Sequence, residues 1–203
     1  MDFYDLWQAS DEPMAVRLVA GLPWEVLSDL EAALIDLARS LPAEYEQIGL
    51  QIWAHPTARI AEDARLSAPC IIAEGAVVKP HAYLRGANYV GKGAVVGHAA
   101  ELKNTVLLSH ATVAHLNYVG DSVLGAYAHL GAGVILSNLR QDNAPVAVQI
   151  GGVRYPTTLR KLGALVGDFA EVGANAVLNP GTVLAAHGKV RPLRSVKGYI
   201  PAD

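Results

Sequence analysis

One stretch of the sequence decides the fold: residues 60–108, IAEDARLSAPCIIAEGAVVKPHAYLRGANYVGKGAVVGHAAELKNTVLL. An aliphatic residue returns at every sixth position without a miss: Ile60, Leu66, Ile72, Val78, Leu84, Val90, Val96, Leu102 and Leu108. Neither an α-helix, with its period of 3.6, nor an isolated strand, with its period of two, produces that spacing. A period of six is typical of β-helices.

The repeat has a simple physical interpretation. Each hexad forms one short side of a triangular coil, with its aliphatic residue pointing inward, and three hexads close one coil. Successive coils then stack at the strand spacing of about 4.8 Å, and the aliphatic residues fill the interior in three columns. The sequence therefore predicts an all-β solenoid built of hexapeptide repeats.

The phase of the repeat slips once and is later interrupted. Leu102 and Leu124 are 22 residues apart where four hexads need 24, so we expect two sides to be one residue short. The rhythm stops after Leu136 and resumes at six-residue spacing from Val166 to Val196. Between them we expect an excursion near 139–162, which contains a β-hairpin over residues 146–155 with a Gly-Gly turn.

The first 50 residues do not follow the six-residue repeat. Pro23 is typical of the first turn of a helix, and leucines at 27, 30, 34 and 37 follow at helical spacing through to Arg39. We expect a small N-terminal helical cap over residues 1–50 and the β-helix over residues 51–203.

Composition limits the functional classes. The hydrophobic fraction of 52% against 17% charged residues argues against disorder, and a net charge of −3 gives no footprint for nucleic acid. Cys70 is alone, so no intramolecular disulfide is possible. The first residues lack the features of a signal peptide, and no apolar run is long enough to span a membrane. We expect a cytoplasmic protein.

Two cations occupy equivalent positions in the repeat. Arg85 and Lys103 each follow an inward leucine and lie 18 residues apart, which is one coil. They should therefore stack on one face, about 5 Å apart at the backbone. A phosphate bound between them would turn their mutual repulsion into a binding site. The alternative is that both long side chains simply extend into solvent.

Histidines give a second signal. His98 and His115 are 17 residues apart, which is one coil if one side is short. A histidine beside a face with two stacked cations is a candidate general base, because the unperturbed pKa of imidazole is near 6.5.

Several runs carry a family resemblance: Glu101 to Thr105, His115 to Asp121, Leu130 to Gly133 and Ser137 to Arg140. Together they resemble the acetyltransferase domain of the bifunctional uridyltransferase/acetyltransferase that makes UDP-N-acetylglucosamine. They are also similar to the C-terminal domain of archaeal bifunctional sugar-1-phosphate nucleotidylyltransferase/acetyltransferases, where the later run from Lys161 to Ala164 recurs. The resemblance extends from about Trp53 to Val196.

The resemblance implies a fold, a reaction and a site. It implies a left-handed helix, a handedness that periodicity alone does not give. His115 would deprotonate a sugar amine, Tyr118 and Asn138 would position sugar and acyl donor, and Arg85 and Lys103 would bind phosphate. Acetyl-CoA would be the donor, held in a groove between the subunits of a homotrimer, and no metal would be needed.

The sequence also departs from the family pattern. His129, which we assign to substrate binding, stands where the bacterial enzymes carry an asparagine. Ala144 and Ala147 occupy the region in which the archaeal relatives have lysines. The first 50 residues contain no Gly-rich phosphate loop, so we expect no nucleotidyltransferase activity from them. These departures predict either an acceptor or CoA contacts that differ from those of the family, or a loss of activity.

Two other functions remain open at this stage. One is a non-catalytic module that binds a sugar nucleotide or serves assembly, which the missing lysines favour. The other is a metal enzyme of the γ-carbonic anhydrase type, which shares the fold. In that case His110 and His115 would bind zinc together with His81 of a neighbouring subunit.

Overall fold

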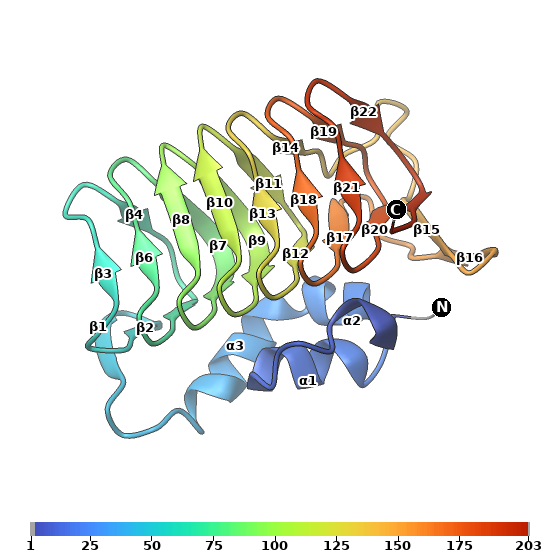
Figure 1. The fold of residues 1–203 in the computed structure, drawn as a ribbon. Coiled ribbons are helices and arrows are strands. Elements are labelled where there is room, and N and C mark those ends of the chain that lie inside the picture. The colour runs from blue at the N-terminus through green and yellow to red at the C-terminus, as the bar shows by residue number, and fades with distance from the viewer. Residues whose placement is uncertain (1–2, 203) are drawn as a thin grey trace.

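The computed structural model describes residues 3–202 and shows a solenoid of stacked triangular coils with helices along one side (Figure 1). It is the predicted left-handed parallel β-helix of hexapeptide repeats. Each coil contributes one short strand to each of three faces, and each strand pairs in parallel with its equivalents in the coils before and after it. The sides of the triangle are therefore continuous parallel sheets.

The strands of the three faces are as follows. Face 1 consists of β4 (Arg65–Leu66), the first part of β7 (Tyr83–Val90), the first part of β9 (Glu101–Leu107), β11 (Tyr118–Gly120), β14 (Ile135–Leu136), β19 (Val177–Leu178) and β22 (Ser195–Val196). Face 2 consists of β3 (Arg59–Ile60), β6 (Val77–Val78), β8 (Val95–His98), β10 (Thr112–His115), β13 (His129–Leu130), β18 (Glu171–Val172) and β21 (Lys189–Val190). Face 3 consists of β2 (Ile52–Ala54), β5 (Cys70–Ile72), the second parts of β7 and β9, β12 (Val123–Leu124), β17 (Ala164–Val166), β20 (Thr182–Leu184) and β23 (Tyr199–Ile200).

The interior of the solenoid is aliphatic, as the repeat predicts. From Ile72 to Leu102 every predicted inward residue is buried in one continuous core, and Ile60 and Leu66 pack against it at the first coils. The two short sides run from Leu102 to Leu107 and from Val119 to Leu124, five residues each, which confirms the predicted phase slip.

The prediction for Leu108 was wrong. The first short side moves the inward position to Leu107, so Leu108 points out of the solenoid and is buried in a second core under the helices. Removing one residue from a side exchanges the inward and outward positions of the residues that follow.

The second core lies between face 3 and the N-terminal segment. After the short 3-10 helix Tyr4–Leu6, this segment forms α1 (Pro13–Val19), α2 (Pro23–Ser28) and α3 (Leu30–Ala38), and then β1 (Glu46–Gly49), which pairs antiparallel with β2. Pro23 occupies the first turn of α2, and the predicted leucine stripe is buried, although the chain breaks between the two helices at Asp29. These helices cover a side of the solenoid and not its end (Figure 1).

Polar anchors attach the N-terminal segment to the coils. The Trp7 indole donates to the carbonyl of Val166 at 2.9 Å. The Glu12 carboxylate accepts from the Tyr89 hydroxyl at 3.1 Å and from the Lys92 amide at 2.7 Å. Each of these buried polar groups has a hydrogen-bond partner on the solenoid. The helices can therefore pack on face 3 without leaving the groups unsatisfied.

The excursion contains the predicted hairpin. Strands β15 (Ala147–Ile150) and β16 (Val153–Pro156) pair antiparallel around Gly151 and Gly152, which have φ of 57° and 78°. Val148 and Ile150 of the hairpin are buried in the second core, and the Tyr155 ring lies 5.7 Å from the Trp24 ring. The hairpin therefore adds to the layer over face 3. None of the helices that the structure describes is long and apolar enough to cross a membrane.

The stacking of coils predicts an asymmetry between two glycine substitutions. Gly97 lies opposite Ala114 of the next coil, and a Cβ added there would lie 1.4 Å from the Ala114 carbonyl oxygen. Gly97→Ala should therefore lower the free energy of unfolding by about 2 kcal/mol or more. Gly21→Ala is the matched control, because its Cβ would come no closer than 3.8 Å to the atoms around it. Equal stability of the two variants in urea unfolding would contradict the described register of β8 and β10.

Candidate functional site

The two cations singled out in the sequence lie side by side on face 1. Arg85 on β7 and Lys103 on β9 are register partners, as one full coil between them predicts. Each faces a carboxylate: Arg85 Nε lies 2.5 Å from Glu101 Oε1, and Lys103 Nζ lies 2.6 Å from Asp121 Oδ1. The hydrogen bond to Glu101 raises the pKa of Arg85. An anion that binds here has to compete with both carboxylates.

Tyr118 and Asn138 converge on the same face, above Gly120. A Cβ on Gly120 would lie 2.7 Å from the Tyr118 hydroxyl and 2.6 Å from Asn138 Nδ2, so no larger residue could occupy that position without moving both groups. Gly120 is also the register partner of Lys103. The two predicted positioning residues and the predicted phosphate ligand thus lie in neighbouring coils of one face.

The Tyr118 phenol has a perturbed ionisation. Partial burial raises its pKa, and the negative charges of Asp121 and Glu101 raise it further, whereas Arg85 and a hydrogen bond with Asn138 act in the opposite direction. Because the normal pKa of a tyrosine is about 10, Tyr118 is a neutral hydrogen-bonding group near neutral pH.

His115 lies at the edge of this face. It ends β10 on face 2, and only the corner residues Leu116 and Asn117 separate it from Tyr118. His98 is its register partner in the preceding coil, as expected, and the His98 ring lies 5.3 Å from that of His81. The His115 side chain is exposed, and its ring has no hydrogen-bond or ion-pair partner among residues 3–202. Its imidazole is free to contact a ligand.

Two other histidines lie elsewhere. His129 begins β13 and pairs with Thr112, at the opposite end of β10 from His115, so the structure does not bring it to the cluster on face 1. His110 lies at the corner between faces 3 and 2, where its ring stacks on Tyr127 at 4.7 Å. His110 and His115 therefore flank β10 at its two ends. Among the described residues, no group of three or more His, Cys, Asp or Glu is placed to hold a metal ion.

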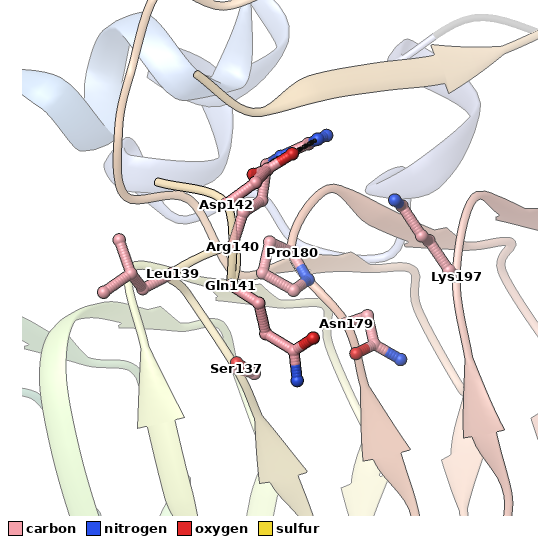
Figure 2. Close-up of a pocket in the computed structure, with 8 residues that line it drawn as sticks. All are labelled: Ser137, Leu139, Arg140, Gln141, Asp142, Asn179, Pro180 and Lys197. Atoms are coloured by element: carbon pink, nitrogen blue, oxygen red, sulfur yellow. Dashed lines mark hydrogen bonds and ion pairs between the residues drawn. The ribbon is translucent and has the colours of Figure 1, made fainter. Parts of the chain in front are cut away.

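A hollow of about 380 Å³ continues face 1 toward the last coils. Ser137 and Asn179 form its floor, Lys197 reaches in from the last coil, and Arg140 belongs to the excursion (Figure 2). Arg140 is paired with Asp142, whose pKa it lowers. Lys197 makes no ion pair with any residue between 3 and 202.

A second hollow of about 180 Å³ shares Arg140 and Lys197 and extends under the hairpin. It adds Arg154, which also has no carboxylate partner in the described part of the chain, and Ala147, one of the alanines noted above. Three cations from the excursion, the hairpin and the last coil thus surround one continuous depression, and among residues 3–202 Asp142 is the only carboxylate that lines either hollow.

Sequence reasoning gave no role to the two carboxylates and missed the depression. Glu101 and Asp121 follow Arg85 and Lys103 by about one coil, so the arithmetic that stacked the cations could also have found their partners. Lys197 and Arg154 gave no such signal, because the excursion brings them together and its path cannot be read from the repeat.

Sequence comparison finds archaeal relatives of similar kind. The chain is 29% identical over 190 residues to a bifunctional sugar-1-phosphate nucleotidylyltransferase/acetyltransferase of Sulfurisphaera tokodaii, a match that covers 85% of this chain and 44% of the relative. It is 32% identical over 188 residues to the bifunctional protein GlmU of Methanococcus maripaludis, covering 84% of this chain and 42% of the relative. The chain thus spans less than half the length of these relatives.

Among solved structures, the chain is similar to a hexapeptide transferase family protein from Anaplasma phagocytophilum. The two are 20% identical with a TM-score of 0.38, and the match covers 72% of this chain and 73% of the other. A family model described as the GMPPB C-terminal domain matches residues 66–200, which is more than half of the chain. The chain therefore belongs to the family of the GMPPB C-terminal domain.

Proposed function

We propose that this chain is an N-acetyltransferase that moves an acetyl group from acetyl-CoA to the amine of an amino-sugar phosphate or related sugar nucleotide. The observation that carries the proposal is the cluster on face 1. Arg85, Lys103, Tyr118 and Asn138 meet in neighbouring coils, and His115 stands at the edge of the same face. This set supplies phosphate ligands, neutral hydrogen-bonding groups and a base.

In the proposed reaction His115 acts as general base. An ammonium cannot attack a carbonyl, so the acceptor has to lose a proton, and imidazole is matched to that task near neutral pH. The amine nitrogen forms a bond to the thioester carbon, the carbon–sulfur bond breaks, and the proton on His115 passes to the departing thiolate. Donors that stabilise the transient oxyanion, such as backbone N–H groups at a corner, lower the barrier.

Arg85 and Lys103 are the proposed ligands of the acceptor phosphate. The two are register partners on face 1, and cations of this type are the usual partners of phosphate oxygens. Glu101 and Asp121 neutralise them in the free protein, so a bound phosphate would share these cations with the two carboxylates. Tyr118 and Asn138 are proposed to contact the sugar beside the phosphate.

The depression around Lys197 supports a donor with phosphate groups. It lies on the same column of face 1 as Lys103, four strand spacings or about 19 Å along the solenoid. Acetyl-CoA has its thioester at one end and its phosphates toward the other, so it would lie along the face with its phosphates near Lys197, Arg154 and Arg140.

A second candidate function has one observation in its favour. A catalytic base is commonly oriented by a third group, and the His115 ring has no such partner among residues 3–202. A non-catalytic module that binds a sugar nucleotide through face 1 would need no oriented base. The zinc enzyme considered above has no comparable support, since His110 and His115 lie at opposite ends of β10.

Replacement of the base tests the proposed mechanism. His115→Ala should lower the rate of acetyl transfer by about 10²- to 10⁴-fold, because the acceptor amine then has no general base. The fold and the binding of acetyl-CoA should be nearly unchanged, as judged by circular dichroism and calorimetry. His55→Ala, at a half-buried histidine near the first coil, is the matched control. Full transfer by His115→Ala would refute the assignment and make His98 and His129 the next bases to test.

The phosphate ligands are tested by binding. Arg85→Ala or Lys103→Ala should weaken the binding of an amino-sugar phosphate by about 1.5–3 kcal/mol, the contribution of a hydrogen bond to a charged group. Calorimetry with the phosphorylated and unphosphorylated sugar measures this directly, and Lys79→Ala, at an exposed lysine of face 2, serves as the control. Equal losses with both sugars would show that the two cations do not contact phosphate.

We also propose that the chain assembles as a homotrimer, in which a neighbouring subunit closes the open sides of the His115 edge and the depression. Cyclic symmetry is the usual arrangement of soluble homo-oligomers. Light scattering at micromolar concentration should give three times the mass of the chain. A monomer at that concentration would exclude a site shared between subunits.

A further inference from the structure

A buried carboxylate behind the cluster on face 1 contacts more than the Lys103 ammonium that it neutralises. Asp121 follows β11 at the corner between faces 1 and 3, where its backbone has a φ of 45°, and it is only 6% exposed. A carboxylate so far from solvent needs several donors to compensate for its lost hydration.

Three donors from separate positions surround Asp121. Lys103 Nζ lies 2.6 Å and Asn104 Nδ2 3.2 Å from its Oδ1. Asn138 Nδ2, from the following coil, donates to its Oδ2. Asn104 Nδ2 also donates to the carbonyl of Leu27 at 2.8 Å, so the helical segment takes part in holding this arrangement. Asp121 thus connects two of the proposed acceptor ligands, Lys103 and Asn138.

This contact determines which end of the Asn138 amide faces the site. An ionised carboxylate can only accept hydrogen bonds, so it selects the amide nitrogen of Asn138. The amide oxygen therefore points away from Asp121, and the Tyr118 hydroxyl hydrogen-bonds with the same amide. An oxygen in this position suits a ligand that donates N–H or O–H.

We propose that Asp121 is a positioning residue of the acceptor site. It turns the Asn138 amide so that its oxygen receives an N–H or O–H group of the acceptor, and it holds the ammonium of Lys103 on the same face. The inference rests on the proposed function in one respect, namely that the acceptor binds on face 1. It adds to that function that Asn138 recognises a hydrogen-bond donor of the acceptor substrate.

A reciprocal exchange of the two residues tests the proposal. In Asp121→Asn two amides face each other, so Asn138 turns over and presents nitrogen to the acceptor. In Asn138→Asp two carboxylates face each other and repel. The double variant Asp121→Asn with Asn138→Asp restores a donor opposite an acceptor and again presents an oxygen to the ligand. Asp36→Asn, at an exposed carboxylate that pairs with Arg17, is the control.

The measurements are the binding of glucosamine 1-phosphate by calorimetry and the kcat and KM of its acetylation with acetyl-CoA. Each single variant should lower kcat/KM for the acceptor, by up to about 100-fold, while the KM for acetyl-CoA stays the same. The double variant should recover at least part of that loss. A general structural defect would instead change both substrates and the thermal midpoint together, and the exchange would not reverse it.

The outcomes separate the inference from the proposed function. Wild-type binding and turnover in Asp121→Asn, or a double variant no better than Asn138→Asp, would overturn the inference alone; the second comparison holds even if Asp121→Asn does not fold. If the variants bind glucosamine 1-phosphate in the predicted order but the wild-type chain does not acetylate it, the proposed reaction is overturned and the inference stands. No binding to the wild-type chain would overturn both.

Discussion

The parallel hydrogen bonding between successive coils is the constraint on which the rest of this structure depends. Each strand is held in register with its equivalent one coil away. A residue's place within its coil therefore determines both the face it occupies and the residues above and below it. The aliphatic position must point inward in every coil, so the residues on either side of it point outward in fixed columns. Arg85, Lys103, Gly120 and Lys197 belong to one such column.

The same constraint explains why the candidate site contains so many compensated charges. Outward side chains in adjacent coils are separated by only about 4.8 Å at the backbone, so like charges stacked there repel unless carboxylates stand between them. Glu101 and Asp121 provide that compensation for Arg85 and Lys103. The depression near the last coils differs in this respect, since Lys197 and Arg154 lack such partners among the described residues. The proposed acceptor and donor ends of the face are therefore electrostatically distinct.

Much of the fold could be predicted because one period carries it. Spacing alone predicted the inward column, the two short sides and the hairpin around Gly151. The same arithmetic predicted that Arg85 and Lys103 are neighbours in adjacent coils. The exact position of a short side could not be read, because Leu107 and Leu108 are both leucines and only packing decides between them. For the site, spacing could place His129 and His115 in adjacent coils. It could not show that His129 pairs with Thr112, at the end of β10 opposite to His115. The role of Asp121 depends on which corner it occupies, which is a property of the folded coil.

The central claim is that face 1 binds an amine and transfers an acyl group to it. The most direct measurement compares two acceptors with the unmodified chain: an amino-sugar phosphate and the same sugar phosphate with a hydroxyl in place of the amine, each with acetyl-CoA. Release of free CoA thiol should accompany an N-acetylated product, seen by mass spectrometry, with the amine alone. Consumption of acetyl-CoA at equal rates with both acceptors would contradict the account. Consumption with neither acceptor would also contradict it.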